Sequence, residues 1–186
     1  MNRKLVNFVA FQAGWFACVL GAANGLPWLG TLLVCLIVAA HIKMAERPHV
    51  ELKLLLLCVM LGLVFDSFLV SSGWVRYSSG MLISGIAPYW ILAMWALFST
   101  TINLSMAWLK SNLVLASVMG AVFGPLSYIA GQRLGAIELI DYRSSLIALA
   151  VIWALAMPIL TFAAGHYDRV RKPAPLVPLQ RLSGGE

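Results

Sequence analysis

The chain has 186 residues, of which 61% are hydrophobic and only 11% are charged, whereas an ordinary soluble domain carries about 25% charged residues. Its mean hydropathy is +0.89 and its formal net charge is +6. This composition excludes a water-soluble globule, a disordered chain and a disulfide-stapled secreted module. A polytopic membrane protein remains, and at about 20 residues per crossing the chain has no room for a separate catalytic domain.

The hydrophobic segments, taken in chain order, predict an all-α fold: a compact bundle of six transmembrane helices. The first two segments are separated only by Asn24-Gly25, a pair that favours a tight turn, and Pro27 suits the first turn of the second helix. These two helices are therefore expected to form a hairpin. The expected crossings are 5–23, 26–44, 54–70, 88–108, 113–131 and 144–164.

Two segments lie outside the predicted helices. Residues 74–87 are moderately apolar but contain Arg76 and several Ser and Gly residues, which predicts an interfacial or re-entrant loop. Residues 166–186 contain four Lys or Arg and three Pro, which predicts a basic, disordered cytoplasmic tail. The expected organisation is a six-helix transmembrane domain over residues 1–165 followed by this tail.

Basic residues are distributed unevenly between the two expected sides of the membrane. With six crossings, ten of the 13 Lys and Arg residues fall on the side that holds both termini. The excess predicts that both termini lie in the cytoplasm. The positive charge then belongs to a cytoplasmic surface that attracts anionic lipid, and no nucleic-acid partner is expected.

The cysteines and histidines do not form a recognisable motif. Cys18, Cys35 and Cys58 all lie within predicted helices, where a thiol behaves as a small apolar group. The three histidines have neither an HExxH pattern nor a paired cysteine. The sequence therefore predicts no metal site, no disulfide and no cofactor.

Asp66 is the one carboxylate clearly inside a hydrophobic segment, and an acid within the membrane is a functional candidate by default. At 1.5 Å per residue from Lys53 it lies roughly 20 Å from the cytoplasmic boundary. Arg76 or Arg133 is expected to neutralise it. The alternative is a structural role, in which Asp66 only ties helices together. The residues expected to line an outward-facing polar pocket at this depth are Asp66, Trp95, Ser99, Tyr128 and Gln132.

Small residues and prolines predict how the helices pack. Small residues recur every four positions on the first and fifth helices, which favours close backbone approach. Such faces serve packing within the bundle or docking to a second membrane protein. Pro158 frees the carbonyl of Ala154, which a neighbouring hydroxyl or a water must then satisfy. The small residues on the two predicted packing faces are Ala13, Ala17, Gly21, Gly120 and Gly124.

Four sequence segments together resemble a domain-of-unknown-function family of small bacterial inner-membrane proteins. They are 62–66, 87–90, 94–103 and 124–136. The resemblance covers nearly the whole chain up to the tail, and it implies six helices, an inner-membrane location and no established activity. The architecture is also somewhat similar to the substrate-binding components of energy-coupling-factor vitamin transporters, and residues 62–66 are similar to the rod-shape protein MreD. Neither likeness carries over a binding residue.

Three classes of function follow from these features. The first is a non-enzymatic membrane subunit that binds a small or lipid-like ligand around Asp66, with proton-coupled transport as a variant. The second is a scaffold that docks a membrane-protein partner through a small-residue face. The third, an intramembrane enzyme, is disfavoured because catalysis of that kind needs at least two convergent groups, and Asp66 is alone at its depth.

Overall fold

The computed structural model of the protein describes residues 2–169. Within this range it contains six α-helices, one short 3₁₀ helix and a pair of three-residue strands. The elements are α1 (Arg3–Ala23), α2 (Pro27–Met44), α3 (Pro48–Ser71), β1 (Val75–Tyr77), α4 (Tyr89–Ile102), η1 (Ala107–Ser111), α5 (Leu113–Arg133), β2 (Ile137–Leu139) and α6 (Tyr142–Arg169).

Five of these helices are long and apolar enough to cross a membrane, and α4 is shorter. Large hydrophobic side chains are exposed along all five, for example Leu36 on α2, Leu56 on α3 and Val114 on α5, each more than 60% exposed. Such a continuous exposed apolar surface is stable only against lipid. The described chain is therefore a polytopic membrane protein that contacts the bilayer around its circumference.

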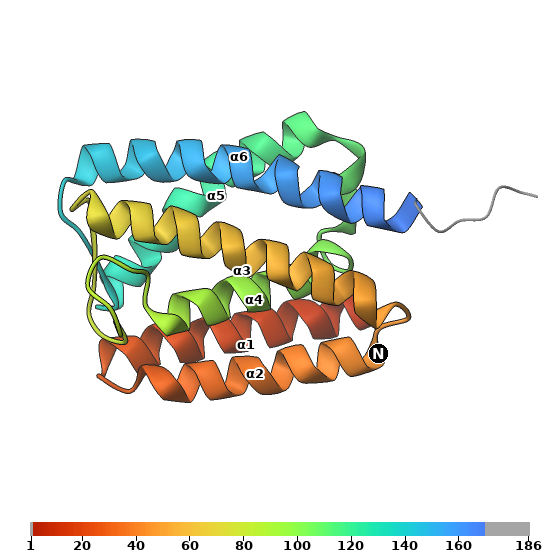
Figure 1. Ribbon diagram of the computed structural model, residues 1–186, viewed down its shortest axis with the longest axis horizontal. Coiled ribbons are helices and arrows are strands. Elements are labelled where there is room, and N and C mark those ends of the chain that lie inside the picture. The colour runs from red at the N-terminus through yellow and green to blue at the C-terminus, as the bar shows by residue number, and fades with distance from the viewer. Residues whose placement is uncertain (1, 170–186) are drawn as a thin grey trace, which may run out of the picture.

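All the long connections lie at the two ends of the bundle (Figure 1). The start of α1, the α2–α3 connection, the α4–α5 connection and the end of α6 are at one end, and the two strands are at the other. The start of α1 and the end of α6 thus lie at the same end of the bundle.

The first two helices form the predicted hairpin. Gly25 has a φ of +74°, a conformation that glycine adopts at little cost, and the Asn24 amide donates to the carbonyl of Leu20. Pro27 is the first residue of α2. Gly30 of α2 sits directly on α1, because a Cβ at Gly30 would lie 2.3 Å from the Cα of Cys18. The helix pair is therefore held by backbone contact.

The expected crossing at 88–108 is only partly helical. Its α-helix, α4, has 14 residues and so is about 21 Å long. Turns and η1 complete the segment as far as Ser111. The helix packs against α1, α2 and α3, and eight of its residues are buried. It is the central helix of the bundle, where protein neighbours replace lipid and a full-length crossing is not needed.

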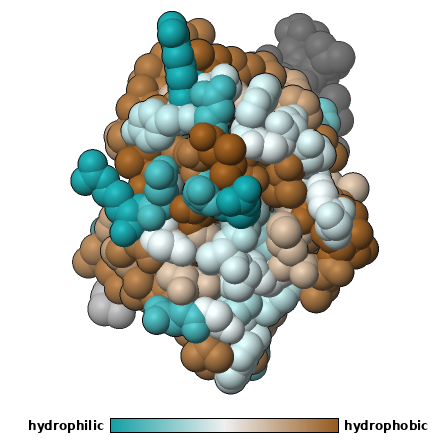
Figure 2. Space-filling model, turned by 90° about the vertical axis from the view of Figure 1, so that its left-hand side faces the viewer, coloured by the Kyte–Doolittle hydropathy of each residue, from teal (hydrophilic) through white to brown (hydrophobic). Residues whose placement is uncertain are grey.

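The 74–87 segment contains a strand that the sequence analysis did not predict. β1 pairs antiparallel with β2 from the α5–α6 connection, with Tyr77 opposite Ile137 and Val75 opposite Leu139. The resulting sheet covers one end of the bundle. Figure 2 looks onto this end, where hydrophilic residues gather near the middle and hydrophobic residues form most of the rim. The first part of the segment therefore covers one end of the bundle and is paired there with a strand from the second half of the chain.

The interruption at Pro158 is resolved within the bundle. Pro158 lies inside α6, and the hydroxyl of Ser117 on α5 donates to the carbonyl of Ala154 over 2.6 Å. A neighbouring hydroxyl therefore satisfies the carbonyl that the proline frees, as predicted. The α6 helix continues through Arg169, so it extends past the expected domain boundary at residue 165. The remainder of the predicted tail, 170–186, lies outside the described residues.

Candidate functional site

Asp66 lies on α3, five residues before its C-terminal end, and is fully buried. The helix forms from a hydrophobic run of mainly Leu, Val, Met and Phe residues, within which Gly62 and Asp66 lie one turn apart. Both therefore face the same neighbour, α4. A carboxyl group in this position needs hydrogen-bond donors from other elements, because helix backbone groups are already paired.

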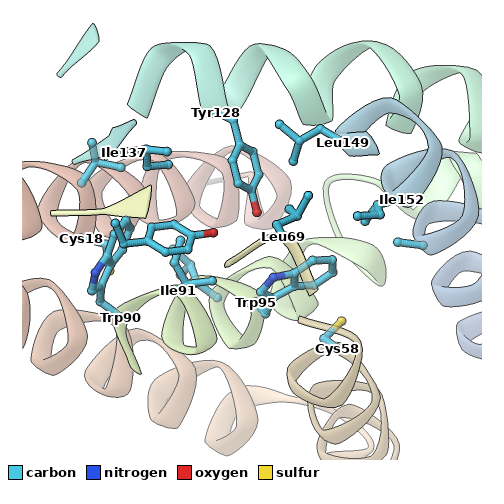
Figure 3. Packing of buried hydrophobic residues seen from close by; sticks show 14 of the residues in the cluster. Cys18, Cys58, Leu69, Trp90, Ile91, Trp95, Tyr128, Ile137, Leu149 and Ile152 are labelled. Carbon is cyan, nitrogen blue, oxygen red and sulfur yellow. The ribbon is translucent and has the colours of Figure 1, made fainter. Parts of the chain in front are cut away.

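Three donors from three different elements surround the Asp66 carboxyl. The hydroxyl of Tyr77 on β1 donates to Oδ1 over 2.5 Å, and the hydroxyl of Tyr128 on α5 donates to the same oxygen. The indole Nε1 of Trp95 on α4 donates to Oδ2 over 2.7 Å. Figure 3 shows the Tyr128 hydroxyl and the Trp95 indole nitrogen pointing into the same space. We call Asp66, Tyr77, Trp95 and Tyr128 the carboxyl cluster.

Two glycines position the indole of Trp95. A Cβ at Gly62 would lie 2.2 Å from Cδ1 of Trp95, so only glycine lets the ring lie flat against α3. On its other face the ring stacks on Trp153 of α6, with centroids 4.7 Å apart and planes 9° apart. Trp153 in turn lies against Gly124, where a Cβ would be 2.2 Å from Cγ of Trp153. Tyr128 follows Gly124 by one turn, which brings its hydroxyl to Asp66.

Tyr77 reaches Asp66 because of the alternation along β1. Val75 and Tyr77 point inward and are buried, while Arg76 points outward. Burial and the nearby Asp66 raise the pKa of the Tyr77 phenol well above its usual value, so the hydroxyl remains a donor. Tyr77 is not among the site residues predicted from the sequence, because residues 74–87 were expected to form a loop. The strand signal present there, a short Val-Arg-Tyr alternation, is too brief to be recognised alone.

The structure brings three of the five predicted pocket residues together and leaves two apart. Asp66, Trp95 and Tyr128 are in contact. Ser99, one turn beyond Trp95, donates to the carbonyl of Ala96. The Oε1 atom of Gln132 is buried with no hydrogen-bond partner among the described residues. The carboxyl is closed off by its three donors, so it does not line an open outward-facing pocket.

The two arginines expected to neutralise Asp66 are engaged elsewhere. Arg76 pairs with Glu138 across the sheet, with 2.8 Å between Nη1 and Oε2, because the strand register places the two residues opposite each other on the outer face. Arg133 is exposed at the end of α5. Among residues 2–169, no Lys or Arg forms an ion pair with Asp66. The charge-partner prediction is therefore corrected: neutral donors surround the carboxyl.

A cavity of about 590 Å³ lies directly beside the carboxyl cluster. It runs between α1 and α5, and α4 and α6 form its floor. Trp95 and Tyr128 belong to its wall, together with Trp15, Phe98 and Trp153. Phe8 on α1 and Phe123 on α5 are more than half exposed at its edges, on the surface that contacts lipid. We call this cavity the lateral groove, because its exposed edges lie on the side of the bundle that faces the bilayer.

The predicted small-residue faces serve contacts within the chain to different extents. Gly120 and Gly124 are both covered by Trp153; a Cβ at Gly120 would lie 2.2 Å from its carbonyl oxygen. Gly21 packs on the backbone of Leu26, at 2.9 Å from a would-be Cβ. Ala13 is exposed and Ala17 is half-buried on α1. The face on α5 is thus occupied by α6, while part of the face on α1 remains open.

A second polar cluster lies at the opposite end of the bundle from the sheet. His41 on α2 lies 3.2 Å from Glu51 on α3, and the Asn103 amide donates to Glu51 over 2.8 Å. The ammonium of Lys110 donates to Asn103. Asn103 therefore links the end of α4 to α3 at this end of the bundle. Across residues 2–169, no three His, Cys, Asp or Glu side chains are grouped so as to hold a metal ion.

Comparison with known proteins adds one finding. Neither the curated proteins nor the solved structures give a match. The profile of a family described as "Protein of unknown function (DUF2878)" matches residues 4–159. The match spans most of the chain, including every residue of the carboxyl cluster and every residue that lines the lateral groove. On this evidence, and with the six-helix architecture expected from the resemblance, the chain belongs to the DUF2878 family.

Proposed function

We propose that the protein is a non-enzymatic membrane protein that binds a small, lipid-like ligand in the lateral groove. The observation that carries the proposal is the groove itself, a cavity of about 590 Å³ with an aromatic and aliphatic wall. Pockets of this size and character are typical of ligand sites. Because the groove opens toward the bilayer, a ligand dissolved in lipid reaches it without crossing water.

In this proposal Asp66 is a positioning residue. Its carboxyl is closed off by Tyr77, Trp95 and Tyr128, and two of these, Trp95 and Tyr128, also form part of the groove wall. Asp66 therefore fixes the orientation of Trp95 and Tyr128 from the side away from the groove, and it does not touch the ligand. A rigid wall lowers the entropic cost of ordering the site on binding.

Filling the groove provides the first test. In Met119→Trp a larger ring occupies part of the groove, and we expect co-purifying lipid-like ligand to fall at least tenfold. The matched control is Leu36→Trp, which places the same ring on the lipid-facing side of α2, where Leu36 is 62% exposed. Native mass spectrometry of both variants, extracted from membranes in parallel, measures ligand occupancy. Equal occupancy in Met119→Trp and in the control would contradict the proposal.

Docking of a partner membrane protein is the second candidate function. Exposed Ala13 on α1 favours it, because small residues permit close helix approach. The α5 face does not, since Trp153 covers Gly120 and Gly124. Ligand binding is the better supported of the two functions, because it explains the groove and its aromatic wall, whereas docking explains only the exposed small residue on α1.

The cellular setting belongs to the same proposal. The family resemblance supports a location in a bacterial inner membrane. The basic residues gathered at the end that carries the start of α1 and the end of α6 support a cytoplasmic position for both termini. The same charge favours contact with anionic lipid at the cytoplasmic face.

A further inference from the structure

The lateral groove contains one side-chain amide, that of Gln12, which has no hydrogen-bond partner within residues 2–169 and lies near the middle of a long transmembrane helix. Gln12 is the tenth residue of the 21-residue α1, so it lies roughly 14 Å from the helix start at 1.5 Å per residue. Its side chain lines the groove and forms no hydrogen bond within residues 2–169. At this depth neither water nor lipid headgroups satisfy an amide, and leaving it unpaired is costly.

Five other polar side chains of the groove donate hydrogen bonds within the protein. Ser105 donates its hydroxyl proton to Asn7, and Thr101 and Ser127 donate theirs to backbone carbonyls one turn earlier. Tyr128 and Trp95 donate to Asp66. The Nε1 atom of Trp153 has no partner in the described chain, but it is buried and cannot be reached from the groove. The amide of Gln12 and the indole N–H of Trp15, one turn further along α1, are therefore left to contact a ligand, and of these two only the amide can also accept a hydrogen bond.

Charge restricts the ligand further. The residues that line the groove include no Asp, Glu, Lys, Arg or His. A phosphate or carboxylate would lie against an uncharged wall in a region of low dielectric, with no cation to compensate it. An amide, in contrast, pairs with a carbonyl or hydroxyl through its N–H or C=O group.

We infer that the groove takes an uncharged, largely apolar molecule whose single carbonyl or hydroxyl group pairs with the amide of Gln12 near the middle of the membrane. This inference rests on the proposed ligand-binding function and specifies its ligand class. The apolar part of the molecule extends along the wall formed by Trp15, Trp95 and Phe98. Phospholipids are excluded, because their charged headgroups stay at the membrane surface.

A matched series of brominated probes tests the inference in lipid nanodiscs that contain the whole protein. The probes are 1-bromododecane, 12-bromododecan-1-ol and 12-bromododecyl phosphate, which share one chain and differ in the polar group. Bound bromine quenches Trp15, Trp95 and Trp153, which line the groove. We expect saturable quenching that is strongest for the alcohol and weakest for the phosphate.

The decisive comparison uses Gln12→Leu, with Gln12→Met as a second apolar replacement. Loss of one hydrogen bond should lower the preference for the alcohol over the alkane about three- to tenfold, while alkane binding is unchanged. Thr31→Val is the matched control. It removes a polar group from α2 that bonds its own helix at Pro27, and it should leave the preference unchanged.

The failure of this inference can be distinguished from that of the proposed function. Saturable binding of all three probes with equal strength, or an alcohol preference that survives both Gln12 replacements, would overturn the ligand class assigned here and leave the groove as a binding site. Quenching that rises linearly with probe concentration for every probe, with no saturable component, would overturn the groove as a binding site altogether.

Discussion

At the scale of single residues, the Asp66 carboxyl is the most constrained group in the described structure. Its two oxygens accept from Tyr77, Trp95 and Tyr128, so four elements meet at one side chain. Three neutral donors take the place of a counter-ion, and each donor is itself buried. The cluster is stable only when it is complete, because any missing partner leaves a buried polar group unpaired.

Removing the acceptor should therefore lower the free energy of unfolding more than removing one donor does. Asp66→Ala leaves two hydroxyls and an indole N–H without partners, and we expect it to lower the free energy of unfolding by about 3 kcal/mol or more. Tyr77→Phe removes one donor and should cost about 2 kcal/mol. Thermal unfolding in detergent, followed by tryptophan fluorescence, compares both with the unsubstituted protein.

The double variant provides the control for this comparison. Since Tyr77 has already lost its acceptor in Asp66→Ala, adding Tyr77→Phe should cost little more, and the two losses should not add. Full additivity of the two losses, or a wild-type melting temperature for Asp66→Ala, would show that these hydrogen bonds do not stabilise the fold.

At the scale of elements, close approach between helices depends on glycines beneath large rings. Gly62 lies under Trp95, and Gly124 lies under Trp153, so two stacked indoles are held between α3 and α5. This arrangement sets the spacing of the helices at the level of the carboxyl cluster. It also forms the inner wall of the lateral groove.

Adding one methyl group tests this packing. In Gly62→Ala the new Cβ would lie 2.2 Å from the Trp95 ring, so the ring or the helix must shift, at a cost of about 1–3 kcal/mol. In the control, Gly165→Ala on α6, no atom of residues 2–169 lies within 4 Å of the new Cβ, and the higher helix propensity of alanine should stabilise the protein slightly. The melting temperatures should therefore change in opposite directions. A melting temperature for Gly62→Ala at or above the wild-type value would contradict the packing argument.

The sequence predicted most elements well, because transmembrane helices carry a strong signal. The crossings, the hairpin at Gly25 and the hydroxyl contact at Ala154 all follow from local chemistry. The short α4 was overestimated, because hydropathy does not distinguish a central helix from a lipid-facing one. The sheet was missed, because a three-residue strand has too few residues to establish a period of two.

The candidate site was predicted only in part, for a geometric reason. Counting residues along each helix gives depth to within about one turn, and so placed Trp95 and Tyr128 near Asp66. It does not give rotation about the helix axis, which depends on packing, and it included Ser99 and Gln132 as well. Nothing in the depth calculation indicated the groove, since a cavity arises from how four helices pack.

At the scale of the whole molecule, the arrangement of the ends makes topology testable. The side chain of Glu46 is 86% exposed at the end with the start of α1, and that of Glu138 is 58% exposed on the sheet at the other end. We expect Glu138→Cys to react with a membrane-impermeant maleimide in intact cells, and Glu46→Cys to react only after the membrane is opened. Both variants are made in a background without Cys18, Cys35 and Cys58.

The labelling pattern separates the two orientations of the bundle. The reverse pattern, with Glu46→Cys labelled in intact cells, would contradict the proposed cytoplasmic position of the termini. Because charge bias determines insertion, changing the distribution of the basic residues should also change the orientation of the chain in the membrane.

The closing of the carboxyl cluster also has a consequence for the order of events on the ribosome. Tyr77 follows Asp66 by 11 residues, but Tyr128 follows it by 62. At 5–20 residues per second, roughly 3–12 s of translation separate Asp66 from its last donor. A nascent chain that ends before α5 therefore holds an incompletely paired acid in the bilayer, and the cost of that unpaired group is removed only when Tyr128 has been made.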